Sequence, residues 1–293
     1  MVSGYWGQVL SQRFDVPSDR PLDDLTAELT GLLGSVDPTE RLEVAVPVLL
    51  AWIDRGVYDH LLLGLGDGIA AGLAAGLGET EGPSVFRRAG SALVLAACID
   101  RDTERNLLGP AAILGWGDRV MTWLLREADV RAFVPGRGVA HAVAHGADAL
   151  GALARSPHVG RLELTVVLDV VADRLLTAPG GRLLGSEVDR LAETVLHVLR
   201  RDLVGLDVLE PWVNRLAADA RPRAAGPLED PWRAGVDAQA FLRALHLQLA
   251  LAPDPPEVRA DLLLVLIAAL RATNAHALVP AARPLVPEAG RPT

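Results

Sequence analysis

Apolar residues recur at intervals of three and four along nearly the whole chain, and short breaks containing Gly or Pro separate these periodic segments. This spacing places the apolar side chains on one face of an α-helix, whereas a half-buried β-strand requires strict alternation. No segment alternates convincingly. Even "LTVVLDVVADRLL" (164–176), which contains several β-branched residues, has the length and flanks of a buried helix. The chain is therefore predicted to be all-α.

The periodic segments number about eleven, and their starts lie roughly 20 to 28 residues apart. A pair of helices then takes roughly 40 residues or more, which is the length of a HEAT-type unit whose pairs bury their apolar faces on one another. No residue motif repeats cleanly along the sequence. We therefore expect a HEAT/armadillo-like α-α superhelix of about eleven helices with degenerate repeats.

The positions of the Gly- and Pro-containing breaks indicate one domain with two flanking segments. Residues 1–20 are predicted to form an N-terminal extension, 21–278 a single α-solenoid domain, and 279–293 a flexible tail of Pro-rich composition. Within the domain, "ARPRAAGPLEDPW" near 220–232 has three prolines and is predicted to be an irregular loop.

Composition is that of an ordinary helical globular protein. Hydrophobic residues make up 50% of the 293 residues, charged residues 22% and aromatics only 4%, so the apolar content comes mainly from the helix formers Leu and Ala. The formal net charge is −9, and every basic residue is Arg. An acidic surface repels phosphate backbones, so the charge argues against a nucleic-acid partner.

Three observations bear on the compartment. Cys98 is the only cysteine, so no intramolecular disulfide can form, which suits a reducing cytoplasm. The N-terminus lacks the basic and apolar regions of a signal peptide. The segment 60–78 has glycines every fourth residue from 64 to 76, but Asp67 interrupts it, and a soluble helix whose glycines admit a close neighbour explains it as well as a membrane helix. We expect a cytoplasmic protein without a membrane partner.

The stretch "RGVAHAVAHGADAL" (137–150) places His141, His145 and Asp148 at i, i+4 and i+7, on one face of a predicted helix. Two imidazoles at this spacing can chelate a divalent metal, and either can act as a general acid or base. The glutamate of an H-E-x-x-H site is missing, because Ala142, Val143 and Ala144 lie between the histidines. Structural hydrogen bonding, binding of a non-metal ligand and metal binding all remain open.

Partners for these three residues would come from elsewhere in the chain. A third metal ligand, if Asp148 does not supply it, could be one of four residues: Glu127, Asp129, Glu193 or His197. No cofactor is the leading expectation, and a divalent metal at the His/Asp cluster is the alternative.

Arginines are the other candidate ligand-binding residues. In "SVFRRAGS", Arg87 and Arg88 are adjacent, and Arg88 could clamp a carboxylate or phosphate, although a salt bridge to Glu127 or Asp129 is favoured. Arg131 and Arg137 flank a Pro-Gly loop that leads into a predicted helix N-terminus, where backbone amides can bind an anion. The candidate ligand-binding residues are Arg88, Arg131, Arg137, His141 and His145.

Three stretches in order, "SVFRRAGSALVLAACIDRD", "LLREADVRAFVPGRGVAHAVAHGADALGALARSP" and "EVDRLAETVLHVLRRD", resemble the bacterial domain-of-unknown-function 2785 family. The resemblance covers roughly Leu22 to Leu216, and "AHAVAHGAD" is its most specific part. It implies an all-α, HEAT-like fold. It implies no activity and brings no functional residues with it.

Three functions compete on these observations. The first is a non-enzymatic helical-repeat protein that binds a peptide, a protein or a small molecule on its concave face. The second is a hydrolase or lyase that uses His141, His145 and Asp148, with or without metal, so whether the chain is an enzyme stays open. The third is a HEAT-like DNA-binding protein, which the acidic charge disfavours.

Overall fold

Helices form nearly all of the regular structure in the computed structural model, which describes residues 4–176, 182–183, 185–220 and 235–274. The first half contains α1 (Tyr5–Ser11), α2 (Leu22–Leu32), a π-helical segment η1 (Thr39–Ala45), α3 (Val46–Asp54), α4 (Leu62–Ala71), a 3-10 turn η2 (Gly72–Ala74), α5 (Ser84–Arg105) and α6 (Pro110–Arg126). The second half contains β1 (Phe133–Val134), β2 (Gly138–Val139), α7 (Ala142–Arg155), α8 (Arg161–Leu176), α9 (Glu187–Leu199), α10 (Leu206–Asp219), α11 (Val236–Leu251) and α12 (Arg259–Thr273). The all-α prediction is confirmed.

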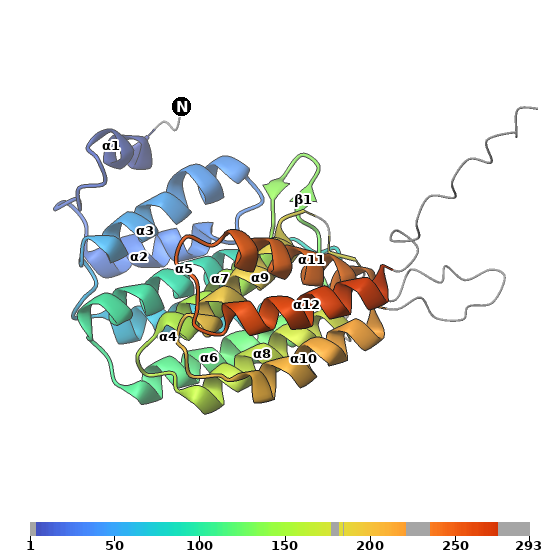
Figure 1. Cartoon of the computed structure of the whole chain (residues 1–293). Helices are drawn as coiled ribbons and strands as arrows, with labels where there is room; N and C mark the ends of the chain where they lie inside the picture. Colours follow the sequence, from blue (N-terminus) through green and yellow to red (C-terminus); the bar gives the residue numbers. More distant parts are fainter. Residues whose placement is uncertain (1–3, 177–181, 184, 221–234, 275–293) are drawn as a thin grey trace, which may run out of the picture.

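Helices two apart in the chain lie side by side, so the fold has two layers (Figure 1). One layer runs α3, α5, α7, α9, α11, and the other runs α4, α6, α8, α10. Helix α12 closes the array by packing on both α10 and α11. Each helix therefore buries one face against the other layer and its sides against its neighbours.

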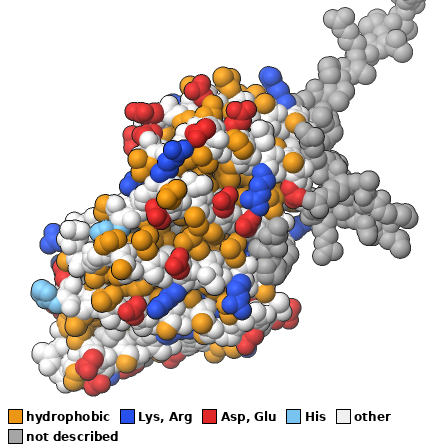
Figure 2. Space-filling model, turned by 90° about the horizontal axis from the view of Figure 1, so that it is seen from below, with side chains coloured by type: hydrophobic (Ala, Val, Ile, Leu, Met, Phe, Trp, Pro, Cys, Tyr) orange, Lys and Arg blue, Asp and Glu red, His pale blue; other side chains and the backbone are white. Residues whose placement is uncertain are grey.

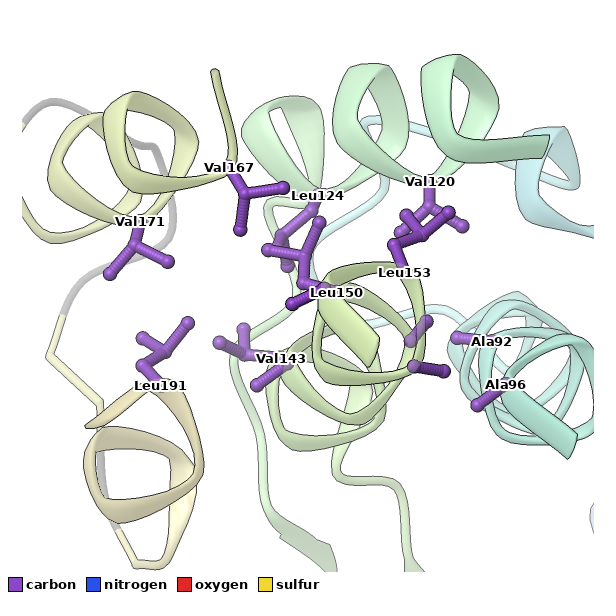
Figure 3. Close-up of a cluster of buried hydrophobic side chains, with 14 of the residues drawn as sticks. Ala92, Ala96, Val120, Leu124, Val143, Leu150, Leu153, Val167, Val171 and Leu191 are labelled. Atoms are coloured by element: carbon purple, nitrogen blue, oxygen red, sulfur yellow. The ribbon is translucent and has the colours of Figure 1, made fainter. Parts of the chain in front are cut away.

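Helix α7 lies at the centre of the core. Eleven of its fourteen residues are buried, and most of those are Ala or Gly. Such small side chains let α5, α7 and α9 approach one another more closely than α4, α6 and α8 do. Figure 3 shows the larger residues of α7 filling the space towards the other helices: Leu150 lies beside Leu124 of α6, and Val143 lies opposite Leu191 of α9.

The structure adds one short hairpin that no alternating pattern in the sequence indicated. Strands β1 and β2 form an antiparallel hairpin in which Phe133 pairs with Val139 and Val134 pairs with Gly138. The turn between them needs left-handed backbone, which Gly136 (φ 73°) and Gly138 (φ 78°) supply. Two-residue strands are too short to produce an alternating pattern in the sequence.

The N-terminal extension contains a helix, α1, which is additional to the eleven or so that the sequence predicted. Trp6 and Val9 of α1 are buried, and Trp6 Nε1 donates a 2.7 Å hydrogen bond to Glu28 of α2. Residues 1–20 therefore include a helix that packs on the domain. The predicted irregular loop at 220–232 (apart from Ala220) and the predicted tail at 279–293 lie outside the described residues.

The glycines at 64, 68 and 72 were expected to let a neighbouring helix pack closely on this segment, but not all of them do so. A Cβ on Gly64 or Gly68 would meet nothing within 4 Å, whereas a Cβ on Gly66 would overlap the buried ring of Trp116, and one on Gly72 would overlap Ser91. The glycine on which α6 packs is thus Gly66, outside the four-residue series. Among the described residues, no helix is long and apolar enough to cross a membrane.

We expect Gly66→Ala to destabilise the protein by about 1–3 kcal/mol, because the added methyl group forces Trp116 out of its packed position. The matched variant Gly64→Ala adds the same methyl group to the same helix in open space, and should stabilise by up to about 1 kcal/mol through helix propensity. Urea unfolding of both variants measures the difference. Equal effects on the free energy of unfolding would contradict this account of the α4–α6 contact.

Candidate ligand-binding groove

A polar groove of about 490 Å³ crosses the layer formed by α3, α5, α7 and α9. Its floor consists of Leu50 of α3 and of apolar or small residues of α5 and α7. Six charged or titratable side chains from three helices line it: Asp100, Asp148, Arg155, Arg190, Glu193 and His197. We call this site the α5–α9 groove. Its position follows from the small side chains of α7, which bring α5 and α9 close enough to share one depression.

Two ion pairs span the groove. Arg155 Nη2 lies 2.8 Å from Asp100 and ties α7 to α5, while Arg190 Nη1 binds Asp148 and ties α9 to α7. Burial alone would raise the pKa of Asp148, but hydrogen bonds from His145 and Arg190 outweigh it and hold that pKa below its usual value. The Asp148 carboxylate is therefore charged at neutral pH, and both carboxylates already have an arginine partner.

Glu193 is the exception among these charges. Its carboxylate is exposed and makes no ion pair or side-chain hydrogen bond with any of the described residues. Two arginines against three carboxylates leave the groove with a formal charge of −1 while His197 is neutral. The groove therefore favours a ligand that carries positive charge.

His197 lies over the floor of the groove in an uncharged form. Burial, assisted by the positive charges of Arg155 and Arg200, lowers its pKa to about 4. The ring reaches this place because residue 151 is Gly: a Cβ there would come within 3.3 Å of the His197 ring and 3.4 Å of Arg155. A neutral imidazole can both donate and accept a hydrogen bond to a ligand.

The prediction that His141 lies on the same helix face as His145 and Asp148 was wrong. The amide of Ala140 donates to the carbonyl of Ala132 (2.9 Å) and continues the hairpin, and His141 then adopts a left-handed conformation (φ 53°, ψ 37°) before α7 begins. A residue outside the helix does not follow its 3.6-residue period, so His141 does not share a helical face with His145.

The two histidines contact different carboxylates. His141 Nδ1 lies 3.2 Å from the buried Glu187, and His145 Nδ1 lies 3.3 Å from Asp148. Their ring centroids are 6.2 Å apart. The three predicted residues thus do not converge on one point, and no group of three His, Cys, Asp or Glu side chains within the described ranges is arranged to hold a metal ion. His145 and Asp148 remain a pair at the edge of the groove.

Arg88 lies in the core, away from any ligand. Its side chain is 0% exposed, and Nε and Nη2 bind the two carboxylate oxygens of Glu127 at 2.5 and 2.7 Å. Its Nη1 donates to Ser84 and to the carbonyls of Ala75 and Gly76. The favoured interpretation, a salt bridge to Glu127, is confirmed, and complete burial leaves the Arg88 guanidinium out of reach of a ligand.

Of the other two predicted arginines, Arg131 precedes the hairpin and Arg137 lies on its turn. Arg131 binds Asp129, two residues before it, and the carbonyl of Gly82. Arg137 is exposed on the hairpin turn. Neither lines the α5–α9 groove. Of the four predicted third metal ligands, Glu127 binds Arg88 and Asp129 binds Arg131. The other two, Glu193 and His197, line the groove.

Sequence reasoning missed three groove residues, Asp100, Arg155 and Arg190. Each lies on a different helix and, in its own segment, looks like an ordinary solvent-facing charge. The available signal was their helical phase, because Asp148 and Arg155 are seven residues apart and so share a face of α7. Which neighbouring helices would face them could not be read from that phase.

The described residues define an all-helical protein of two layers with a polar groove across one of them. The sequence profile of the family described as "Protein of unknown function (DUF2785)" matches residues 73–247, more than half of the chain. The chain belongs to this family, and the predicted resemblance is confirmed, with a match that starts later and ends later than Leu22–Leu216. No curated protein and no solved structure matches the chain.

We expect Arg88→Met to cost about 3–5 kcal/mol of stability, because it leaves the buried Glu127 carboxylate without its counter-charge. The double variant Arg88→Met/Glu127→Gln removes the stranded charge and should lose less than the single variant. Arg161→Met, in an exposed pair with Asp207, is the control and should change stability by less than about 1 kcal/mol. Urea unfolding measures all three; a single variant as stable as the wild type would contradict the assignment.

His197 should make the stability of the protein fall as the pH is lowered. Its pKa is about 4 in the folded chain against 6.5 for an unperturbed histidine, so between these values the unfolded chain binds a proton that the folded chain does not. The stability that His197 contributes by staying neutral is complete above pH 6.5 and is lost as the pH falls towards 4. Unfolding free energies of the wild type and His197→Gln, measured across that range, should diverge, the wild type losing more. Parallel curves would show that His197 titrates normally.

Proposed function

We propose that this chain is a non-enzymatic, HEAT-like helical-repeat protein of the cytoplasm that binds a peptide or small molecule carrying a basic group in the α5–α9 groove. The observation that carries the proposal is the unpartnered carboxylate of Glu193, which lies beside two ion pairs that satisfy every other charge of the groove.

The layer arrangement supports a superhelix of helix pairs. Alternate helices fall into two layers, and each pair packs on the next, as HEAT-type units do. Spacing is closer among α5, α7 and α9 than among α4, α6 and α8. An array with unequal spacing bends towards its closer layer, so the α5–α9 groove lies on the concave face, where helical-repeat proteins present their binding surfaces.

The polar lining supports a ligand with a basic group and hydrogen-bonding capacity. The arginines of the groove are neutralised by Asp100 and Asp148, so an anionic ligand would have to displace an existing partner. A cation, in contrast, meets the exposed oxygens of Glu193 without cost to either pair. Neutral His197 and the half-exposed ion pairs add polar groups for the rest of the ligand.

A hydrolase or lyase is the second candidate, and one observation favours it. Asp148 holds His145 by its Nδ1, as a carboxylate does when it orients a general base. However, Arg190 binds the same oxygen of Asp148, and His141 is turned towards Glu187 instead of joining the pair. If this candidate were correct, the wild type would hydrolyse members of a nitrophenyl ester panel and His145→Gln would not.

A DNA-binding role has less support than either. Figure 2 shows acidic and basic side chains interspersed among hydrophobic ones on the face seen from below, without a continuous basic track on that face. The groove on the other layer has a negative formal charge. Both features oppose the electrostatic attraction on which binding to a phosphate backbone depends.

The test compares two sets of fluorescein-labelled hexapeptides. The first is a mixed library in which every peptide has one central arginine. The second has the same sequences with citrulline, the neutral isostere of arginine, at that position. We expect arginine peptides to bind the wild type at least tenfold more tightly, as measured by fluorescence polarisation. Glu193→Gln should remove this preference. Glu210→Gln, an exposed glutamate of α10 in the other layer, should keep it. Equal binding of the two peptide sets, or a preference that Glu193→Gln retains, would refute the proposal.

A further inference from the structure

A second cavity, of about 770 Å³, lies between α2 and α4 on a different part of the molecule. Leu22, Leu61 and Leu63 border it, and the last two are about half exposed. Gly64 and Gly68 form part of its floor, where a Cβ would meet nothing within 4 Å. We call it the α2/α4 groove. Its volume is that of a small-molecule site, and its apolar floor is open to close contact.

Three hydroxyl groups in the walls of this groove already have partners. Thr26 Oγ1 donates to the carbonyl of Leu22 (2.7 Å) and lies 2.9 Å from the hydroxyl of Tyr58, and Thr30 Oγ1 donates to the carbonyl of Thr26 (2.6 Å). Burial raises the pKa of Tyr58 to about 12, so its phenol stays neutral. An apolar chain can therefore cover these three hydroxyl groups without leaving any of them unpaired.

Arg87 is the exception, and it lies at one end of the groove. It is half-buried, and none of the described residues forms an ion pair or hydrogen bond with its guanidinium. Burial lowers its pKa, and no carboxylate acts against that effect. An arginine remains protonated in such surroundings, and the carboxylate of Asp23, which also lines the groove, forms no ion pair with it.

The surroundings of Arg87 explain why a cation is tolerated there. Its Cβ packs over Gly34, just beyond the last residue of α2, and its Nε lies beside Gly72, just beyond the end of α4. The C-terminal end of α2, which favours positive charge, therefore lies near this side chain. This placement favours the cation and leaves its donors free to bind an anion.

We propose that the α2/α4 groove binds a medium-chain fatty acid, with the carboxylate on Arg87 and the alkyl chain along the glycine floor. The guanidinium matches a carboxylate in charge and in bidentate geometry. From Asp23 to Gly31 the groove follows α2 for roughly 12 Å, at 1.5 Å per residue, which suits an extended chain of the length of decanoate. Asp23 at the far end repels a second carboxylate and so fixes the orientation.

This site is independent of the α5–α9 groove. Apart from Arg87, its lining residues all precede residue 73, where the family match begins. Arg87 and Arg88 are adjacent in the sequence, but Arg88 turns into the core and Arg87 turns towards α2 and α4. Failure of one proposal therefore leaves the other standing.

The experiment is calorimetric titration of the full chain with decanoate and with decanol, which has the same chain and no charge. We expect decanoate to bind at least tenfold more tightly than decanol. Arg87→Met should weaken decanoate at least tenfold, and Arg87→Lys should restore part of that loss. Gly68→Leu, which fills open space on a helix and should fold normally, is expected to abolish binding. Arg126→Met, an exposed arginine of α6, is the matched control and should bind as the wild type does.

Three results would overturn the proposal. The first is the absence of decanoate binding by a folded wild type. The second is equal affinity for decanoate and decanol, or an affinity that Arg87→Met leaves unchanged. The third is a concentration-dependent dimer in sedimentation that Gly68→Leu abolishes, because this would assign the groove to a second copy of the chain.

Discussion

The close approach of α5, α7 and α9 is the constraint on which the rest of the structure depends. It is set by the small side chains of α7, eleven of whose fourteen residues are buried. Because these helices are close, charged residues on their exposed edges meet across α7, and Asp100, Arg155 and Arg190 become parts of one groove. Gly151 extends the same effect to the floor, where it leaves room for His197. The small side chains of α7 thus account both for the packing of these helices and for the α5–α9 groove.

A second set of interactions holds the chain between α6 and α7. Arg88 and Glu127 form its buried centre, and Arg174 of α8 donates to the carbonyls of Leu124 and Glu127. Further along, Arg41 donates to the carbonyls of Arg137 and Val139 and so fastens the hairpin to η1. Arg41, Arg88 and Arg174 thus serve structural contacts in this region.

The two grooves use charge in opposite ways. In the α5–α9 groove, arginines and aspartates neutralise one another, and the surplus is the single carboxylate of Glu193. In the α2/α4 groove the wall hydroxyls are internally hydrogen-bonded, and the guanidinium of Arg87 forms no ion pair with the Asp23 carboxylate that also lines the groove. In each case the unpartnered charge, and not the size of the cavity, indicates the kind of ligand, because a charge without a partner gains the most from one.

The sequence by itself determined the helical class and the family, because apolar periodicity and Gly/Pro breaks act within single segments. It also identified Asp148, Glu193 and His197 as residues of interest. Only the tertiary structure decided that His141 leaves the helix, that Arg88 is buried while Arg87 faces a groove, and which helices supply Asp100 and Arg190. The physical reason is that these outcomes depend on which helix faces lie opposite one another. Helix–helix packing sets that arrangement between segments distant in the chain, and no local pattern encodes it.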